Sequence, residues 1–361
     1  MVTSSTGQQI IPSQQVVPSI PVPSRGPLRF ALTTQEAEQT RAAVAGLAQA
    51  AHASPPDEPT ELLRALPAAV RLLPERLLRF LETFRREEPA GGFVVNGWNV
   101  DDAALGPTPA HWRTAAEPRR TTLDHELYLL LIASGLGEVF SWSTVQDGQL
   151  VQDICPVAGE ETEKNAGSSA SVLDLHNEDA FSPLRCDYLG LLCLRNDDQV
   201  PTEYAGIEQV ALTRAQRRTL AEPRYLLTPD EEHLRRAAER GEQPPAPQHT
   251  GILFGDPAAP YLAFDGYFLE TDPHDEEARA ALTALTDELR RCRSEVTLAP
   301  GELLIVDNYR AVHGRRPFPA RYDGRDRWLK RVGVTRDLRR SRAARASVTS
   351  PVVLTAAAMT P

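Results

Sequence analysis

The stretch that most constrains this chain runs from Leu173 to Phe181 and reads LDLHNEDAF. Its centre holds His176 and Glu178, with one residue between them. In an extended strand, side chains two positions apart point to the same face. An imidazole nitrogen and a carboxylate oxygen would therefore converge on one point a short distance off a sheet. The stretch predicts a strand that presents two metal-ligand side chains together.

A third ligand would come from a neighbouring strand. His313 is the natural candidate, because it stands at the end of the apolar run in IVDNYRAVHGRRP (305–317). Two histidines and one carboxylate make the facial triad that holds non-haem Fe(II) and leaves three coordination positions open. A His-x-Glu pair alone is a weak signal. The other histidines lack a partner at metal-binding spacing and are interpreted as surface or packing residues: His52, His111, His125, His233, His249 and His274.

Arg327 strengthens this interpretation. It follows His313 by fourteen residues, with the turn signal Tyr322-Asp323-Gly324 between them. Such a turn would fold a second strand back beside the first, so that Arg327 returns to the level of His313 in the same cavity. A guanidinium offers a two-pronged fork for a carboxylate, as a keto acid that also chelates the metal would need. The alternative is a surface ion pair with Asp323 or Asp326.

The chain divides into a long central part and two unlike ends. Residues 1–28 are rich in Ser, Gln, Val and Pro and are interpreted as a disordered arm. Residues 29–338 are predicted to form one domain with N-terminal helices and a surface insertion near 222–250. Residues 339–361 begin with a basic run and are interpreted as a solvated C-terminal tail.

Many short apolar runs with Gly and Pro turns, framed by helices, predict a mainly β fold with helical decoration. The expected architecture is a distorted double-stranded β-helix, or jelly roll. The runs 139–146 and 150–157 are predicted to pair as a hairpin across Asp147-Gly148. The polar segment 159–171, just before the His-x-Glu pair, is interpreted as a mobile lid.

Composition narrows the possible partners. The formal net charge is −10 and the isoelectric point is near 5.4, which argues against a nucleic-acid partner. No apolar run approaches the length needed to span a bilayer, and the N-terminus does not resemble a signal peptide. The four cysteines form no Cys-x-x-Cys pair, so a reducing cytoplasm fits best. The expected partner is a small molecule.

These motifs together resemble a known family. HNEDAF (176–181), the strand DYLGLLCLRN (187–196) and VHGR followed by YDGRDRWLKR (322–331) are similar to the clavaminate synthase-like Fe(II)/2-oxoglutarate dioxygenases. The similarity is greatest to the arginine and asparagine β-hydroxylases, which act on free amino acids. It covers about 91–338 and implies a jelly roll, Fe(II), 2-oxoglutarate and O2, with release of succinate and CO2.

The resemblance also implies roles for individual residues. His176, Glu178 and His313 take the positions of the metal ligands. Arg327 takes the position of the clamp on the distal carboxylate of 2-oxoglutarate, and Thr202 that of a second contact to the same cosubstrate.

Substrate contacts follow from the same motifs. Arg331, four residues beyond Arg327 and so on the same strand face, corresponds to the residue that binds the substrate α-carboxylate; its alternative is a cation at a basic strand end. Ser168 and Ser169 correspond to serines that help hold the amino group, or they belong to a flexible loop. Gln146 matches part of a Thr-Gln-Gln segment of the relatives, with Val145 in place of the other Gln.

The segment YLAFDGYF departs from the pattern. Arginine-hydroxylating relatives carry Asp-x-Asp there, whereas this chain has Asp265 alone, with Ala263 and Tyr267 two positions away on either side. Two buried carboxylates need a cation to offset their desolvation, while one carboxylate and a hydroxyl also suit a neutral group. We therefore expect a free L-amino acid with a neutral or weakly basic side chain, such as citrulline, with arginine remaining open.

Two other classes stay open at this point. One is an oxygenase that acts on a carrier-tethered amino acid or another small acid, with hydroxylation, desaturation or epoxidation as the outcome. The other is a jelly-roll binding module without redox chemistry. Composition also suggests a role in specialised, antibiotic-type metabolism. The sequence does not indicate the oligomeric state.

Overall fold

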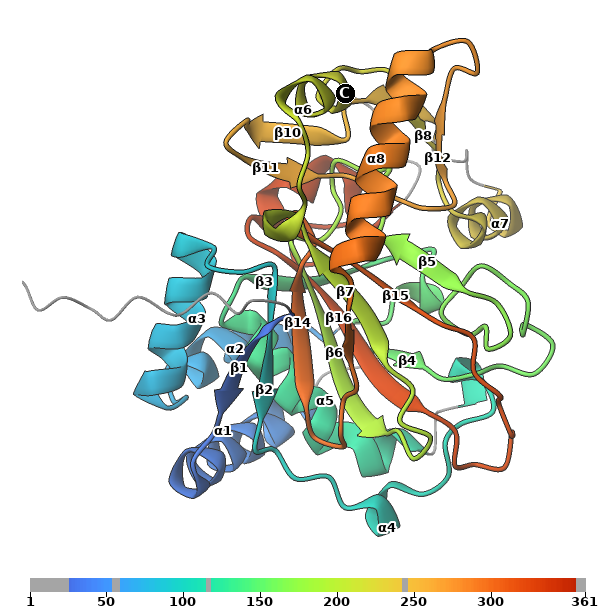
Figure 1. The fold of residues 1–361 in the computed structure, drawn as a ribbon. Coiled ribbons are helices and arrows are strands. Elements are labelled where there is room, and N and C mark those ends of the chain that lie inside the picture. Colours follow the sequence, from blue (N-terminus) through green and yellow to red (C-terminus); the bar gives the residue numbers. More distant parts are fainter. Residues whose placement is uncertain (1–25, 54–58, 115–117, 242–245, 355–361) are drawn as a thin grey trace, which may run out of the picture.

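The computed structural model describes residues 26–53, 59–114, 118–241 and 246–354. Two sheets face each other across a buried core, in the jelly-roll arrangement that the sequence predicts (Figure 1). No helix in these ranges combines the length and the apolar character that a membrane crossing requires. Most of the proposed arm, residues 1–25, and the end of the tail, residues 355–361, lie outside the described residues.

The major sheet has the strand order β1-β2-β14-β6-β16-β3-β17, and β4 also pairs with β16. Its strands are β1 (Leu28–Ala31), β2 (Gly92–Asn96), β3 (Glu138–Trp142), β4 (Gln152–Ile154), β6 (Tyr188–Arg195), β14 (Leu303–Asp307), β16 (Trp328–Thr335) and β17 (Val352–Val353). Neighbours are antiparallel except β1 with β2 and β17 with β3. All eight residues of β6 are buried because both faces of this central strand are covered.

The minor sheet is antiparallel and has the order β13-β7-β15-β5. Its strands are β5 (Leu173–His176), β7 (Thr202–Gly206), β13 (Ser294–Val296) and β15 (Ala311–Arg315). Leu191 and Leu304 of the major sheet and Tyr204 and Ala311 of the minor sheet belong to one buried cluster between the sheets. This core holds the two sheets at a set distance.

Helices cover the outer face of the major sheet (Figure 1). They are α1 (Thr34–Ala53), α2 (Thr60–Val70), α3 (Glu75–Glu87) and α5 (Pro118–Ser134). A capping box starts α1: the Glu36 N–H donates to the Thr33 hydroxyl, and the Thr33 N–H donates to the Glu36 carboxylate. The short helical segments are α4 (Asp102–Leu105), η1 (Trp112–Thr114), η2 (Gln146–Gly148), η3 (Ile207–Gln209) and η4 (Leu338–Ala344).

A second group of elements lies at one end of the sheets, at the top of Figure 1. It comprises α6 (Arg214–Leu220), β8 (Tyr225–Leu227), α7 (Glu231–Glu239), β9 (Gln248–Thr250), β10 (Leu253–Asp256), β11 (Ala259–Leu262), β12 (Leu269–Thr271) and α8 (Glu276–Cys292). The insertion predicted near 222–250 supplies β8, α7 and β9. β8 pairs with β9 and β12, and α7 packs inward. His233 and Ala237 of α7 are fully buried, so this insertion is not a purely surface element.

The predicted hairpin across Asp147-Gly148 is wrong. β3 and β4 do not pair with each other; both pair with β16, β3 alongside Gly333–Thr335 and β4 alongside Leu329–Arg331. The turn between them, with Asp147 and Gly148 at positive φ, displaces the chain along one edge instead of reversing it. A turn signal shows where the chain bends, whereas the long-range partner decides the pairing.

The C-terminal region also differs from the expected solvated tail. Residues 338–344 form η4, and β17 adds to the edge of the major sheet beside β3. Ala344 and Val353 are almost completely buried in the core between the sheets. Arg339 and Arg342 are exposed, whereas Arg345 is buried and donates to the carbonyls of Val348 and Ser350.

Candidate active site

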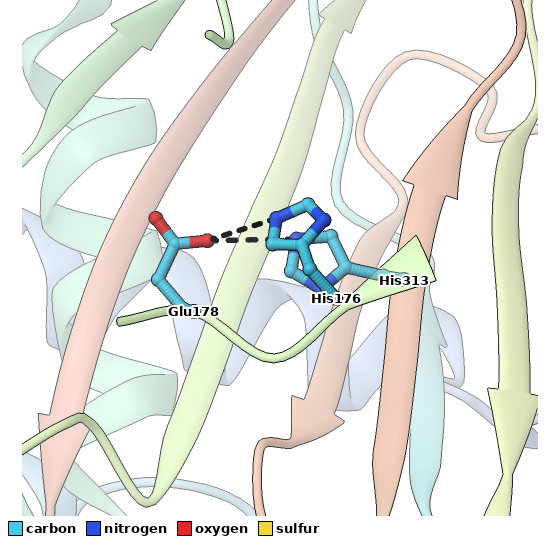
Figure 2. A group of neighbouring side chains, drawn as sticks. All are labelled: His176, Glu178 and His313. Carbon is cyan, nitrogen blue, oxygen red and sulfur yellow. Dashed lines mark ion pairs between the residues drawn. The ribbon is translucent and has the colours of Figure 1, made fainter. Parts of the chain in front are cut away.

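The two histidines and the glutamate converge, with ligand atoms within 4.8 Å of one another (Figure 2). Nε2 of His176 lies 3.7 Å from Oε2 of Glu178, and Nε2 of His313 lies 3.6 Å from the same oxygen. His176 is paired with His313 in the register of β5 and β15, and their ring centroids are 4.3 Å apart. Sheet pairing therefore brings together residues that are far apart in the sequence.

Glu178 reaches this point from a turn and not from the strand that the sequence predicts. β5 ends at His176, and two asparagines fix the chain that follows. The Asn177 amide donates to the carbonyls of Asn308 and Ala311, and the Asn308 side chain accepts the Glu178 N–H at 2.8 Å. These bonds tie the turn to the loop before β15, so the carboxylate is held close to both imidazoles.

Hydrogen bonding and charge prepare the three side chains to bind a cation. Nδ1 of His176 donates to the Asp174 carbonyl at 2.8 Å, which leaves Nε2 directed at Glu178. Burial lowers the pKa of His176, but Glu178 and Asp265 outweigh this and raise it to about 9. Burial and the neighbouring His176 lower the pKa of His313 to about 3. Burial raises the pKa of Glu178, but Arg331 and the two imidazoles outweigh this and lower it, so the carboxylate is anionic. An anionic carboxylate beside two imidazoles fits a ferrous ion.

A positively charged pocket lies at one side of this triad. Arg327, just before β16, donates to the Thr202 hydroxyl of β7 at 3.0 Å. The sequence correctly places Arg327 and His313 in one cavity, but not for the reason given. β15 belongs to the minor sheet and β16 to the major sheet, so the two residues face each other across the jelly roll instead of lying on adjacent strands.

Arg315 is a residue of this pocket that the sequence interpretation missed. It lines the same cavity and is only 4% exposed. Burial and the nearby Arg327 lower its pKa to about 9, and burial lowers the pKa of Arg327 to about 10. Within the described residues no carboxylate pairs with either guanidinium, and the Nε of each makes no hydrogen bond. Two buried cations without an anion favour the binding of one.

The serines before the triad have a different position from the one expected. Arg315 donates to the Ser168 hydroxyl at 2.9 Å, and Ser168 in turn donates to the Asn165 carbonyl. Ser168 and Ser169 are buried behind the cavity, whereas Asn165 and its neighbours line it. Ser168 therefore orients Arg315, and neither serine faces the space where an amino group would bind.

Arg331 lies on the other side of the triad. Arg327, Leu329 and Arg331 all line the cavity, as the alternation along β16 predicts. Arg331 forms an ion pair with Glu178, and its Nε donates to Gln152 at 2.6 Å. The guanidinium is therefore fixed in orientation close to the proposed metal position.

Gln146 does not reach the cavity. Its amide donates to the Asp153 carbonyl at 2.8 Å and accepts the Asp153 N–H at 2.9 Å. Val145 lines the cavity in its place. The expected role of Gln146 in substrate binding is not supported, because both polar atoms of its side chain already hold the turn between β3 and β4.

Acidic residues gather at the far end of the cavity. Asp265 lies beside His176 through an isolated β-bridge, and its carboxylate accepts the N–H groups of Tyr267 and Phe268. Asp230 and Glu232, at the start of α7, line the same cavity. Burial raises the pKa of Asp265 and of Glu232. Asp230 and Glu232, both from the insertion, are thus further acids of the cavity besides Asp265.

Tyr267 also lines this end, with its hydroxyl donating to the Val172 carbonyl at 2.5 Å. Lys164, from the segment predicted to be a lid, stands over the Tyr267 ring at 5.0 Å. The cavity has an empty volume of about 1100 Å³, including solvent at its mouth. The triad, the buried arginines and the acids all line this one cavity.

A jelly roll that gathers two histidines and a carboxylate beside buried arginines has the architecture of a 2-oxoglutarate-dependent oxygenase. Comparison with known proteins agrees. Residues 207–332 match the taurine catabolism dioxygenase TauD, TfdA family. The chain belongs to the Fe(II)/2-oxoglutarate-dependent dioxygenases of this family, in the clavaminate synthase-like group, and the resemblance found in the sequence is confirmed.

The chain is 38% identical to the L-ornithine/L-arginine 3-hydroxylase of Catenulispora acidiphila, over 87% of this chain and 96% of the relative. It is 42% identical to the enduracididine β-hydroxylase of Streptomyces hygroscopicus, over 78% of this chain and 87% of the relative. Among solved structures, the non-haem iron oxygenase OrfP in complex with Fe and alpha-ketoglutaric acid matches with a TM-score of 0.81 and 41% identity. That match covers 90% of this chain and 99% of OrfP.

Proposed function

We propose that this protein hydroxylates a free L-amino acid with a cationic, arginine-like side chain, coupled to conversion of 2-oxoglutarate and O2 to succinate and CO2. One observation carries the proposal. One cavity is lined by a triad of metal-ligand side chains, by three further carboxylates and by two buried arginines that form no ion pair within the described part of the chain. The cavity thus has a place for a dicarboxylate and a separate place for a cation.

His176, Glu178 and His313 would hold the ferrous ion, which when bound supplies the activation of O2 and the oxidation of an unreactive C–H bond. The chain contributes position and the exclusion of water. The Asp174 carbonyl keeps His176 in the tautomer that presents Nε2, and the two asparagines hold Glu178 in place.

Arg327 and Thr202 would bind the distal carboxylate of 2-oxoglutarate, and Arg315 would share its charge. The two guanidiniums are desolvated before the cosubstrate arrives, which costs free energy that an incoming carboxylate recovers. Because Ser168 fixes Arg315, the carboxylate would meet donors that are already oriented.

Arg331 would bind the substrate α-carboxylate. Its guanidinium presently pairs with Glu178, and a guanidinium has enough N–H groups to serve both carboxylates. The substrate backbone would then stand next to the metal, and its side chain would point along the cavity towards Asp265.

Asp265, Asp230 and Glu232 would receive the side chain, with Tyr267 at the edge. Three carboxylates in one partly buried space repel each other unless a cation lies among them. This favours arginine, ornithine or a cyclic guanidine over citrulline, which has the length of arginine without its charge. The similarity to hydroxylases of arginine, ornithine and enduracididine supports the same substrate class.

A role in antibiotic metabolism and a cytoplasmic location form part of the proposal. The first is supported by the enduracididine β-hydroxylase and by clavaminate synthase 2, to which the chain is 33% identical. The second is supported by four free cysteine thiols, all buried.

The test is turnover by the purified protein with Fe(II), 2-oxoglutarate and O2. Arginine, ornithine and enduracididine are compared with citrulline and asparagine, and succinate is measured together with addition of one oxygen atom to the amino acid. We expect kcat/KM for the best cationic substrate to exceed that for citrulline at least tenfold. Faster turnover of citrulline or asparagine than of every cationic amino acid would overturn the assignment of the side chain.

A further inference from the structure

His233 links two parts of the site that are distant in the sequence. It lies in the first turn of α7 and is fully buried. Its Nε2 lies 2.9 Å from the Asp179 carboxylate, and its Nδ1 lies 2.7 Å from the Thr144 hydroxyl. The edges of Trp142 and Phe181 enclose the ring, with centroids at 5.5 and 5.1 Å. Such a fixed imidazole is neither the surface residue nor the simple packing residue that the sequence suggested.

Each partner of His233 leads to the active site. Asp179 directly follows Glu178 and has a φ of 51°, a left-handed conformation that an L-residue adopts only at a cost. Thr144 directly precedes Val145, which lines the cavity. At this turn the Asp179 carboxylate lies beside His233, while that of Glu178 lies beside the two histidines of the triad.

The helix that carries His233 also carries the acids. Asp230 is three residues before it and caps the helix by accepting the His233 N–H at 2.8 Å. Glu232 immediately precedes it. Both acids line the cavity, whereas the His233 side chain points into the protein. The imidazole therefore fixes this helix start to the turn that follows Glu178.

We propose that His233 is a positioning residue that sets the distance between the acids of α7 and the metal site, and so determines recognition of the substrate cation. The inference rests on the proposed function, because it assumes that Asp230 and Glu232 receive the side chain. A shift of this helix would move both carboxylates while leaving the triad, Arg327 and Thr202 unchanged.

A second metal site is the alternative, because ligand atoms of Asp179, Asp230 and His233 lie within 4.8 Å of one another. The hydrogen bonds exclude it in this arrangement. Both ring nitrogens of His233 are engaged, one by Asp179 and one by Thr144, so neither has a lone pair directed at a shared centre. The geometry is that of a hydrogen-bonded link between two segments.

The experiment compares His233→Phe, which keeps the ring and removes both hydrogen bonds, with His233→Gln, which can still reach Asp179. The matched control is His125→Phe, a histidine of α5 that accepts the Trp98 indole N–H and does not line the cavity. Thr144→Val, which removes one bond with little change of shape, serves if His233→Phe fails to fold.

For His233→Phe we expect KM for arginine to rise about tenfold or more, the size typical of a residue that orients ligands. KM for 2-oxoglutarate should stay within about twofold of the wild type. The preference for arginine over citrulline should fall, and succinate should exceed hydroxylated product. His233→Gln should recover part of the loss, and Thr144→Val should give a smaller change in the same direction.

Binding provides a readout besides turnover. Arginine should raise the Tm of the metal-free wild type and of His125→Phe but not of His233→Phe, while 2-oxoglutarate should raise all three. The positioning role would be overturned if arginine raised the Tm of His233→Phe as much as that of His125→Phe. It would also be overturned if the KM values for arginine and for 2-oxoglutarate rose by the same factor in His233→Phe. Absence of turnover by the wild type with every amino acid would instead overturn the proposed function on which it rests.

Discussion

Arg331 and Glu178 form an ion pair, which joins the residue proposed to bind the substrate carboxylate to a residue proposed to bind the metal. Gln152 holds the other side of the same guanidinium. The substrate backbone and the metal are therefore positioned by one connected set of side chains. A change at Arg331 should weaken binding of the amino acid more than binding of 2-oxoglutarate, because the cosubstrate pocket around Arg327 is formed by other residues.

Replacement of Arg331 tests this relationship. Arg331→Ala should lower kcat/KM for the amino acid about 10- to 100-fold, the loss expected for a charge-assisted pair of hydrogen bonds. KM for 2-oxoglutarate should change little. Arg336→Ala, which removes a 42% exposed arginine just beyond the same strand, is the control. Unchanged activity of Arg331→Ala would favour an oxygenase acting on a carrier-tethered substrate.

Replacement of Glu178 tests the metal site. Fe(II) and 2-oxoglutarate should together give a weak visible charge-transfer absorption in the anaerobic wild type, and Glu178→Ala should lose it. Two histidines alone hold the ion too weakly, since the carboxylate supplies the negative charge of the triad. Glu270→Ala, on the exposed side of β12, should keep the absorption. A colourless wild type would point to a binding module without redox chemistry.

Replacement of Arg315 should weaken binding of 2-oxoglutarate without lowering the stability of the free protein. Arg315→Met should raise KM for 2-oxoglutarate about tenfold or more, because one of the two cations facing its carboxylate is lost. Without cosubstrate the variant should unfold at the same temperature as the wild type or higher, since a buried cation without an anion is destabilising.

The control for this change is Arg316→Met, which removes a half-exposed arginine paired with Glu203 and Glu295. Its KM for 2-oxoglutarate should match the wild type. A normal KM in Arg315→Met together with a lowered Tm would show that Arg315 serves only to hold Ser168.

Asp307 should give stability a measurable pH dependence. Burial raises the pKa of this β14 carboxyl to about 7, from an ordinary value of 3.8. Between these pH values the folded protein keeps a proton that the unfolded chain has lost, so the free energy of unfolding falls as pH rises. The slope should not exceed about 1.4 kcal/mol per pH unit for one group.

Urea unfolding of the wild type and Asp307→Asn from pH 4.5 to 7.5 measures this contribution. As pH rises, the free energy of unfolding of the wild type should fall relative to that of Asp307→Asn, because the amide of the variant has no proton to lose. Asp256→Asn, at the exposed end of β10, should run parallel to the wild type. Parallel curves for Asp307→Asn would show that this carboxyl is ionised throughout the range.

Local signals in the sequence identified much of the protein. The spacing of His176 and Glu178, the run ending at His313 and the YDGRDRWLKR motif were enough to recognise the family and its jelly roll. The capping box of α1 and the alternation that turns Arg327, Leu329 and Arg331 inward were also readable. Each depends on residues a few positions apart, where backbone geometry alone sets the direction of a side chain.

Only the tertiary structure decided what depends on contacts between distant segments. The partner of β3 and β4 is β16 and not each other, and β15 and β16 face each other from separate sheets. That Arg315 has no carboxylate partner among the residues the structure describes can be seen only when its surroundings are known. Asp230 and Glu232 join Asp265 because α7 packs inward through His233, and no spacing along the chain encodes that contact. Strand partners, burial and the charge that surrounds a side chain are properties of the packed molecule, which is why the substrate end of the cavity could not be assigned from the sequence alone.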